Sequence, residues 1–158
     1  MNHILDILEQ DAHTPPEQIA ERLKMDPDTV RNLIREWERT KVIRRYKAIV
    51  DRNAIGDKRV TAYIDVEIAP ARGTGFDEVA GTIARLPEVL SVVLVSGESD
   101  LRITVECADI DEVANFVSRK LAPLKMVTNT NTHFLLRRYK DEGELFIDDE
   151  DHRLPVAP

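Results

Sequence analysis

The sequence predicts an α+β protein, in which a helical N-terminal domain is followed by a domain of the order βαββαβ. Three observations support this prediction. Apolar residues recur at helical spacing over the first 40 positions, they alternate as in strands from about residue 60, and a short polar stretch separates the two patterns. We therefore expect a first domain over 1–50, a linker over 51–59, a second domain over 60–140 and an acidic tail over 141–158.

Two helices are expected before residue 25. The first covers residues 2–10, where the apolar residues at positions 4, 5, 7 and 8 share one face. The second begins at Thr14, because Thr14 and Glu17 have the spacing of a capping box. Pro15 then takes the first helical position, where its missing N–H costs nothing. The buried stripe of this helix is formed by Ile19, Ala20 and Leu23.

A third helix is expected over residues 27–40. Asp26 is a typical N-cap, and Pro27 again fits the first helical position. Its buried stripe is formed by Val30, Leu33, Ile34 and Trp37. Two short helices separated by a tight turn form a helix-turn-helix. The alternation over residues 44–50 predicts a short strand, which gives residues 1–50 the layout of a winged helix-turn-helix.

The second domain alternates between strand and helix patterns. Residues 60–68 have apolar residues at every second position, as in a half-buried strand. The later elements are a helix over 76–86, strands over 89–95 and 101–107 joined by a turn at 97–100, a helix over 109–121 and a strand over 126–139. This order is that of a ferredoxin-like fold. Cys107 falls on the inward side of its strand, so we expect it to be a small core hydrophobe.

Charge is unevenly distributed along the chain. The net charge is −7 and the pI is near 5.1. Residues 141–158 hold seven Asp and Glu against one Arg, whereas residues 29–49 hold seven Lys and Arg against two Glu. An acidic protein therefore carries a basic surface on its third helix and on the segment after it. The acidic tail either competes with phosphate for that surface or serves only solubility.

The residue types on the third helix fit contact with double-stranded DNA. Arg31, Asn32 and Arg35 are types that bind guanine and adenine edges in the major groove. Arg39, Arg44 and Arg45 would meet phosphates. Asp28, next to Thr29 at the start of the helix, could cap the helix or accept a hydrogen bond from a cytosine amine. The alternative is a solvated helix face that happens to be basic.

The order and spacing of many of these residues resemble one protein family. The positions that carry the resemblance are Ile19-Ala20, Leu23, Asp26, Val30, Ile34, Trp37-Glu38, Val42-Ile43, Ala48 to Asp51, Ile55-Gly56, Pro87 to Val89, Gly97, Asp100-Leu101 and Thr130 to Leu136. Together they resemble the Lrp/AsnC family of bacterial and archaeal transcriptional regulators. The resemblance implies a winged-helix DNA-binding domain, a ferredoxin-like regulatory domain, and homodimers that often assemble into octamers.

The resemblance also implies an effector site at the 97–100 turn. In the family, the corresponding turn borders a pocket between subunits that binds an amino acid or a related small molecule. Backbone N–H groups near Gly97 and Ser99 could receive its carboxylate, and Asp100 its ammonium group. Thr130 and Thr132 on the last strand are further candidates. The alternative is an ordinary hairpin turn with two threonines that are simply good strand formers.

Other classes of function have less support. No apolar run is long enough to span a bilayer, no secretory signal pattern opens the chain, and a single cysteine cannot form a disulfide framework. We therefore expect a cytoplasmic protein without membrane contact. The histidines at 3, 13, 133 and 152 lack metal-ligand spacing, and neither a phosphate-binding glycine loop nor a nucleophile elbow occurs. We expect no metal, no cofactor and no catalysis.

Two alternatives remain open at this point. Sirohaem decarboxylases share the expected architecture, and their chemistry depends on histidines and basic residues around a tetrapyrrole. Here the second domain holds only His133, and the basic residues concentrate on the third helix and wing, which favours DNA. The other alternative is an interaction module whose helix-turn-helix does not bind DNA. The local charge of +5 over residues 29–49 counts against it.

Overall fold

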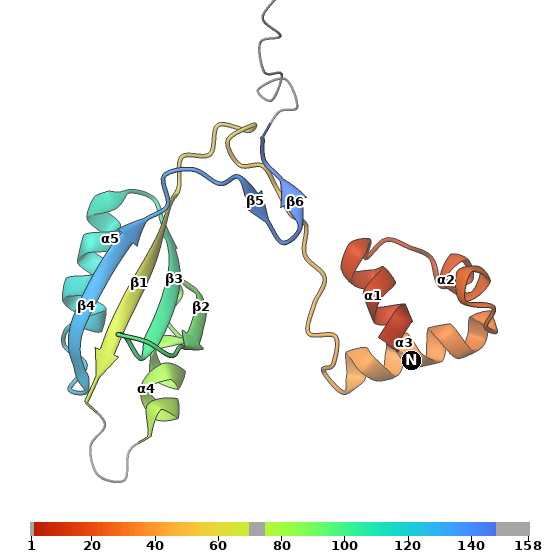
Figure 1. The fold of residues 1–158 in the computed structure, drawn as a ribbon, viewed down its shortest axis with the longest axis horizontal. Coiled ribbons are helices and arrows are strands. Elements are labelled where there is room, and N and C mark those ends of the chain that lie inside the picture. The colour runs from red at the N-terminus through yellow and green to blue at the C-terminus, as the bar shows by residue number, and fades with distance from the viewer. Residues whose placement is uncertain (1, 70–74, 148–158) are drawn as a thin grey trace, which may run out of the picture. The chain divides into compact units, whose positions relative to one another are not determined.

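The computed structural model describes residues 2–69 and 75–147. The chain divides into two compact units, Met1–Ile49 and Val50–Pro158 (Figure 1). The first unit is helical and the second contains a four-stranded sheet with helices, so the predicted α+β class is confirmed. Within the described residues, no helix combines the length and apolar character needed to cross a membrane.

The first unit consists of three helices around a small core. They are α1 (Asn2–Gln10), α2 (Pro16–Leu23) and α3 (Pro27–Arg39). The core residues, which include one stripe from each helix, are Ile4, Leu8, Ile19, Ala20 and Val30. Leu33, Ile34 and Trp37 of α3 pack against this core with part of their surface exposed. The predicted helix-turn-helix is therefore present, and its buried faces are the predicted ones.

The two predicted helix starts differ in outcome. At α3 the prediction is confirmed, because an Asp26 carboxylate oxygen accepts a hydrogen bond from the Thr29 backbone N–H at 2.8 Å. At α2 the prediction is wrong by one residue: Pro15 is extended, with φ −64° and ψ 147°, and Pro16 is the first helical residue. The reason is steric, since Pro16 disfavours a helical conformation for the residue before it. Thr14 makes no cap and is instead buried.

The predicted wing strand is wrong. Residues 44–50 form no strand in the described structure. After α3, the Ile43 backbone N–H donates to the Trp37 carbonyl at 3.0 Å, and the Tyr46 hydroxyl donates to Glu38 at 3.0 Å. These contacts hold the segment near the end of α3 without giving it a neighbouring strand. Alternation alone cannot make a strand, because the backbone also needs a hydrogen-bonding partner.

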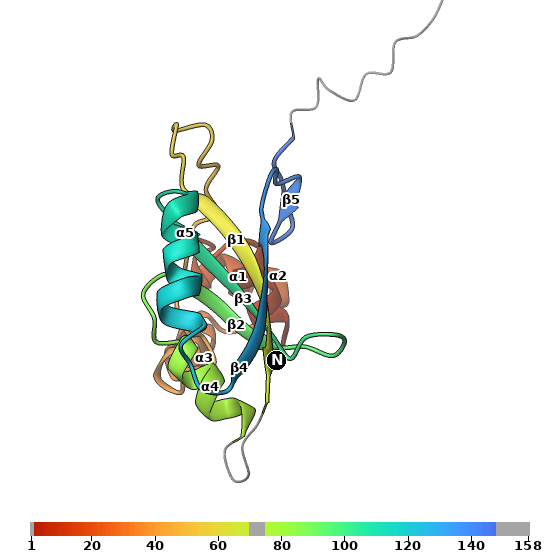
Figure 2. The same ribbon diagram turned by 90° about the vertical axis from the view of Figure 1, so that its left-hand side faces the viewer.

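The second unit has the predicted ferredoxin-like topology. Its strands are β1 (Val60–Ile68), β2 (Val89–Leu94), β3 (Leu101–Cys107) and β4 (Val127–Phe134). All neighbours are antiparallel, in the order β2-β3-β1-β4. Two helices, α4 (Phe76–Ile83) and α5 (Ile110–Phe116), lie on the same face of the sheet (Figure 2). A short π-helical turn, η1 (Val117–Leu121), extends α5.

The core of the second unit lies between the sheet and these helices. The alternating residues of β1 and β3 point toward the helices and are buried; they are Ala62, Ile64, Val66, Ile68, Leu101, Ile103, Val105 and Cys107. Cys107 is only 3% exposed, and burial raises the pKa of its thiol. It therefore behaves as the small core hydrophobe that the sequence predicts. The opposite face of the sheet carries the polar residues of β1 and β3.

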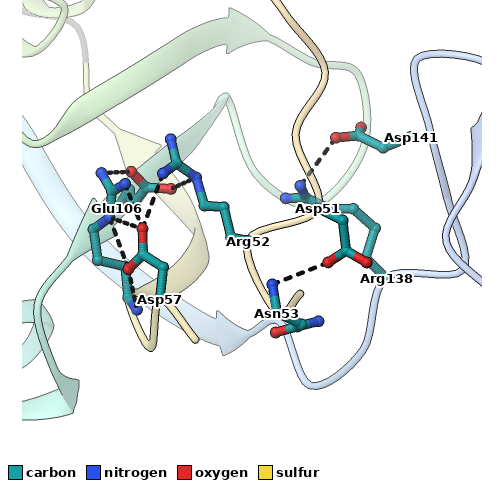
Figure 3. Close-up of polar contacts among 8 residues, drawn as sticks. Asp51, Arg52, Asn53, Asp57, Glu106, Arg138 and Asp141 are labelled. Carbon is teal, nitrogen blue, oxygen red and sulfur yellow. Dashed lines mark hydrogen bonds and ion pairs between the residues drawn. The ribbon is translucent and has the colours of Figure 1, made fainter. Parts of the chain in front are cut away.

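The expected linker over 51–59 is bound to the second unit. Arg59 contacts Glu106 of β3 at 2.6 Å and Asp57 at 2.6 Å. Arg52 contacts Asp57 at 2.9 Å (Figure 3). Arg52, Asp57, Arg59 and Glu106 form one network of ion pairs. It ties the start of the second unit to the end of β3. The segment is therefore an ordered part of this unit, because its charged residues find partners that are distant in sequence.

The C-terminal region also differs from the expectation. The last long strand ends at Phe134, and β5 (Lys140–Asp141) pairs with β6 (Glu144–Leu145) across a turn at Glu142 and Gly143. Both turn residues have positive φ, as a tight hairpin requires. Residues 141–147, expected to belong to the acidic tail, therefore include a short hairpin. The remainder of the predicted tail, 148–158, lies outside the described residues.

Candidate nucleic-acid interface

The face of α3 opposite its buried stripe is basic and exposed. Val30 is fully buried, while Asn32, Arg35 and Arg39 lie on exposed positions and Arg31 is half-buried. The helix begins at the Asp26 cap and packs its apolar stripe against α1 and α2, so its orientation within the unit is set by the core. The predicted DNA-contacting residues of α3 therefore project from a rigid support.

Arg31 is held by two carboxylates. Its Nη2 lies 2.6 Å and its Nε 3.3 Å from the Oε1 atom of Glu17 on α2. Its Nη1 contacts Asp28 of α3. The hydrogen bond from Arg31 lowers the pKa of Glu17, and the same contact raises the pKa of Arg31. Arg31 thus links the two helices of the helix-turn-helix and is electrically compensated.

Two other predicted residues also have partners within the chain. Arg39 donates from Nε to the Oε2 atom of Glu36 at 2.8 Å, and this pair lies on the surface. Thr29 donates both its backbone N–H and its hydroxyl to Asp26, at 2.8 and 3.0 Å. The first contact neutralises a cation. In the second, Asp26 caps the helix by accepting from Thr29, and Thr29 therefore has a structural role.

The remaining predicted residues have no such partners. Within residues 2–69 and 75–147, Asn32, Arg35, Arg44 and Arg45 make no side-chain hydrogen bond or ion pair. Three of them are cations, and all are exposed. Among the predicted DNA-contacting residues, the uncompensated cations thus lie on the second half of α3 and the segment that follows. This distinction between paired and unpaired arginines was not available from residue types.

The predicted effector turn has a clear structural role. Asp100 accepts a hydrogen bond from the Ile68 backbone N–H at 2.7 Å, and its own N–H donates to the Val66 carbonyl at 3.0 Å. Asp100 therefore connects the turn to the end of β1. Gly97 has φ +137°, a conformation that side chains with a Cβ rarely adopt. Both residues behave as the ordinary-turn alternative requires.

The five predicted effector residues are not brought together within one chain. A shallow pocket beside the turn is lined by residues that include Glu98, Ser99 and Arg102. Thr130 and Thr132 of β4 pair with Val66 and Ile64 of β1, so they point to the helix-covered face. Asp65 and Arg102, which line the pocket, alternate with buried residues and therefore belong to the opposite face. A single chain thus does not form the whole predicted site.

The open face of the sheet contains a charged group that sequence reasoning did not find. Arg102 of β3 donates to Asp65 of β1 through two hydrogen bonds of 2.7 and 3.0 Å. The pKa of Asp65 is lowered, chiefly by Arg102. His133 Nε2 lies 3.5 Å from the same carboxylate. The three residues come from three strands, and only the strand register shows that they are neighbours.

Comparison with known proteins identifies the family. Residues 61–145 match the model of the Lrp/AsnC ligand binding domain. The chain is 43% identical over 157 residues to an uncharacterized HTH-type transcriptional regulator of Bacillus subtilis, YugG, covering 98% of this chain and 95% of the relative. It is 27% identical over 142 residues to the HTH-type transcriptional regulator FL11 of Pyrococcus horikoshii, covering 90% and 91%.

Solved structures show the same fold. A transcriptional regulator of Neisseria meningitidis, crystallised as a complex with L-Met, has a TM-score of 0.70 at 23% identity, covering 88% of this chain and 89% of that one. The leucine response regulatory protein LrpA of Mycobacterium tuberculosis has a TM-score of 0.74 at 19% identity, covering 90% and 94%. The family comprises regulators and not enzymes, so the decarboxylase alternative is not supported. The matched ligand-binding domain, the helix-turn-helix and the 43% identity show that the chain belongs to the Lrp/AsnC family of HTH-type transcriptional regulators.

Proposed function

We propose that this regulator contacts double-stranded DNA chiefly through Asn32, Arg35, Arg44 and Arg45. The observation that supports this assignment is that Arg31 and Arg39 are paired with carboxylates. Arg35, Arg44 and Arg45 have no such partner within the described residues. A phosphate displaces only water from Arg35, Arg44 or Arg45, whereas it must displace a carboxylate from Arg31 or Arg39. Arg35 and Asn32 lie on the helix and are candidates for base contact; Arg44 and Arg45 are candidates for phosphate contact.

The other predicted DNA residues have supporting roles in this proposal. Asp28 and Thr29 hold the first turn of α3 through Arg31 and Asp26. Arg39 and Glu36 are both well exposed, and surface ion pairs of this kind contribute little. Arg39 can therefore exchange Glu36 for a phosphate at small cost. It remains a phosphate-contacting residue in the proposal.

The regulator would act as a homodimer, with higher assemblies such as octamers built from dimers. Two copies of α3 would then read half-sites in successive major grooves, about one helical turn of DNA apart. Apolar side chains exposed on the second unit support contact between copies; they include Leu90, Val93, Leu94, Leu136 and Leu145. The protein would work in the cytoplasm.

An amino acid or a related metabolite would be the effector. Two structures support this class of ligand: the Neisseria meningitidis regulator in complex with L-Met, and a feast or famine regulatory protein of Mycobacterium tuberculosis in complex with L-methionine. One Asp100 oxygen is occupied by Ile68, so the ligand would use the other oxygen and the backbone near Gly97 and Ser99. Thr130 and Thr132 would take part only if another copy contributed them, since they point to the other face of the sheet.

Selection of bound genomic fragments, followed by titration across a salt series, tests the DNA assignment. Arg35→Ala should weaken binding of the selected fragment by about 1–3 kcal/mol and relax specificity at one position. Arg45→Ala should weaken binding of all sequences and reduce the salt slope by about 1. Absence of sequence-selective binding by the wild type would refute the DNA proposal. Unchanged binding by both variants would refute the choice of residues.

Calorimetric titration with L-methionine and the other common amino acids tests the effector assignment. Asp100→Asn is the informative variant, because it keeps an oxygen acceptor for the Ile68 N–H and removes the charge. We expect it to fold normally and to lose at least several-fold in affinity. Equal affinity of Asp100→Asn and wild type would show that Asp100 does not receive the ammonium group.

A further inference from the structure

The Glu17–Arg31 contact joins the two helices of the helix-turn-helix. Glu17 lies in the first turn of α2, and Arg31 lies 14 positions later on α3. Two guanidinium nitrogens meet one Glu17 oxygen, at 2.6 and 3.3 Å, while a third contacts Asp28. Since a guanidinium is planar and its N–H groups point in fixed directions, three contacts define where it points. The Arg31 head group is therefore held in one orientation.

The charges around Arg31 sum to −1. One arginine lies between Glu17 and Asp28, so the N-terminal half of α3 presents no net positive charge here. Non-specific attraction to DNA depends on cations that replace the counterions of phosphates. A compensated arginine contributes little to that attraction. Among the predicted DNA-contacting residues, the uncompensated Arg35, Arg44 and Arg45 are the ones expected to contribute to it.

We propose that Glu17 is a specificity-determining residue for DNA recognition. It holds Arg31 away from phosphates, and so limits the affinity of the regulator for DNA of arbitrary sequence. It also fixes α2 relative to α3, which positions Asn32 and Arg35 for base contact. This inference rests on the proposed function, namely that the exposed face of α3 meets DNA.

Glu17→Gln is the primary test, and Glu21→Gln is its matched control. Glutamine keeps an oxygen that can accept from Arg31 but removes the negative charge. Glu21 lies one turn later on the same helix, is exposed and has no side-chain partner within the described residues, so its variant removes the same charge without affecting Arg31. Both variants and the wild type are titrated with the selected operator and with a scrambled duplex of equal length, across a salt series.

The proposal predicts a larger salt dependence for Glu17→Gln. Because a neutral glutamine holds the Arg31 guanidinium less strongly than a carboxylate does, Arg31 should bind one further phosphate in this variant, which steepens the slope of log affinity against log salt by about 0.9. Affinity for the scrambled duplex should rise several-fold, and the ratio of operator to scrambled affinity should fall. Glu21→Gln should change both affinities by the same small factor and leave the ratio unchanged. An unchanged ratio and slope in Glu17→Gln would overturn the proposal.

The test is completed by introducing Arg31→Gln both into the wild type and into Glu17→Gln. In the wild type it should leave the salt slope unchanged, and in Glu17→Gln it should restore the wild-type slope. A slope reduced by about 1 in the wild-type background would mean that Arg31 already binds a phosphate, which also overturns the proposal. Should Glu17→Gln fail to fold, Asp28→Asn removes the other carboxylate and should steepen the slope in the same direction. If Arg35→Ala also changes nothing, then α3 does not meet DNA and the proposed function itself fails.

Discussion

The two units of this regulator are stabilised to different extents by their cores. In the described residues, the helical unit has five buried apolar core residues, whereas the sheet unit has thirteen. Small domains bury a smaller fraction of their surface and are correspondingly marginal. The helical unit therefore relies more on local features such as the Asp26 cap.

This difference has a functional consequence. In the helical unit, the charged residues nearest the proposed DNA surface also hold the helices together, so DNA contact and stability are coupled there. In the sheet unit, the Asp65–Arg102 pair lies on the open face of the sheet, opposite the face that packs the apolar core. Changes in charge should thus affect the stability of the helical unit more than that of the sheet unit.

Truncation of one core residue in each unit should show whether the helical unit and the sheet unit unfold independently. Ile19 and Ile64 are both fully buried, and replacement of such a residue by alanine costs about 2–5 kcal/mol. Ile19→Ala should strongly lower the unfolding temperature of the helical unit, or leave that unit unfolded, and should eliminate DNA binding. The unfolding temperature of the sheet unit should stay near that of the wild type. Ile64→Ala should lower only the sheet transition. Calorimetry checks this, and a single transition that shifts equally in both variants would contradict the comparison.

Gly97→Ala should destabilise the sheet unit through the backbone alone. No heavy atom lies within 4 Å of the position of an added Cβ, so steric contact is not the cause. The φ of +137° is the cause, and such strain costs about 1–3 kcal/mol. Chemical denaturation should show a lower free energy of unfolding for the sheet unit and an unchanged one for the helical unit. Wild-type stability in this variant would mean that the turn readily adopts another conformation.

Asp26→Ala should lower the melting temperature of the helical unit by several degrees. It removes the acceptor for two donors of Thr29 and leaves the first turn of α3 uncapped. Asp109→Ala, which removes the corresponding cap of α5, is the matched variant in the sheet unit. Because α5 is anchored by buried Val113 and Phe116, Asp109→Ala should lower the melting temperature of the sheet unit by less than Asp26→Ala lowers that of the helical unit. Equal shifts in thermal melts would count against the proposed difference.

The Asp65–Arg102 pair should give a small stability contribution that depends on pH. Arg102 holds the pKa of Asp65 below its usual value, so the folded chain binds fewer protons here than the unfolded chain. The contribution is therefore present above the ordinary carboxyl pKa of about 4 and is lost as the pH falls through that range. At pH 7 the free energy of unfolding of the wild type should exceed that of Asp65→Asn by about 1 kcal/mol or less, since Arg102 is half exposed.

Denaturation of both proteins from pH 7 to pH 3 checks this prediction. The two stabilities should converge as the pH falls, because protonated Asp65 and asparagine are both neutral. Asp111→Asn is a suitable control, since Asp111 lies in the first turn of α5 and is exposed. A difference that stayed constant with pH would assign the effect of Asp65→Asn to packing rather than to charge.

The sequence by itself determined the elements whose signals are local. The strand over residues 60–68 and the start of α3 agree with the prediction, because alternation and an Asp-Pro cap act within a few residues. The order βαββαβ follows from the same patterns. The α2 start was wrong by one residue although its signal is also local: the effect of Pro16 on Pro15 outweighs the capping box.

Only the tertiary structure decided which of these residues are available for function. The predicted DNA residues have the same chemistry in sequence, yet Arg31 is bound to Glu17 across the turn and Arg35 has no partner within the described residues. Likewise, Asp100 accepts from Ile68, and the strand register directs Thr130 and Thr132 away from the turn pocket. Ion pairs and register join residues that are distant in sequence. Residue type and local periodicity contain no information about such contacts, because they arise only when the elements pack together.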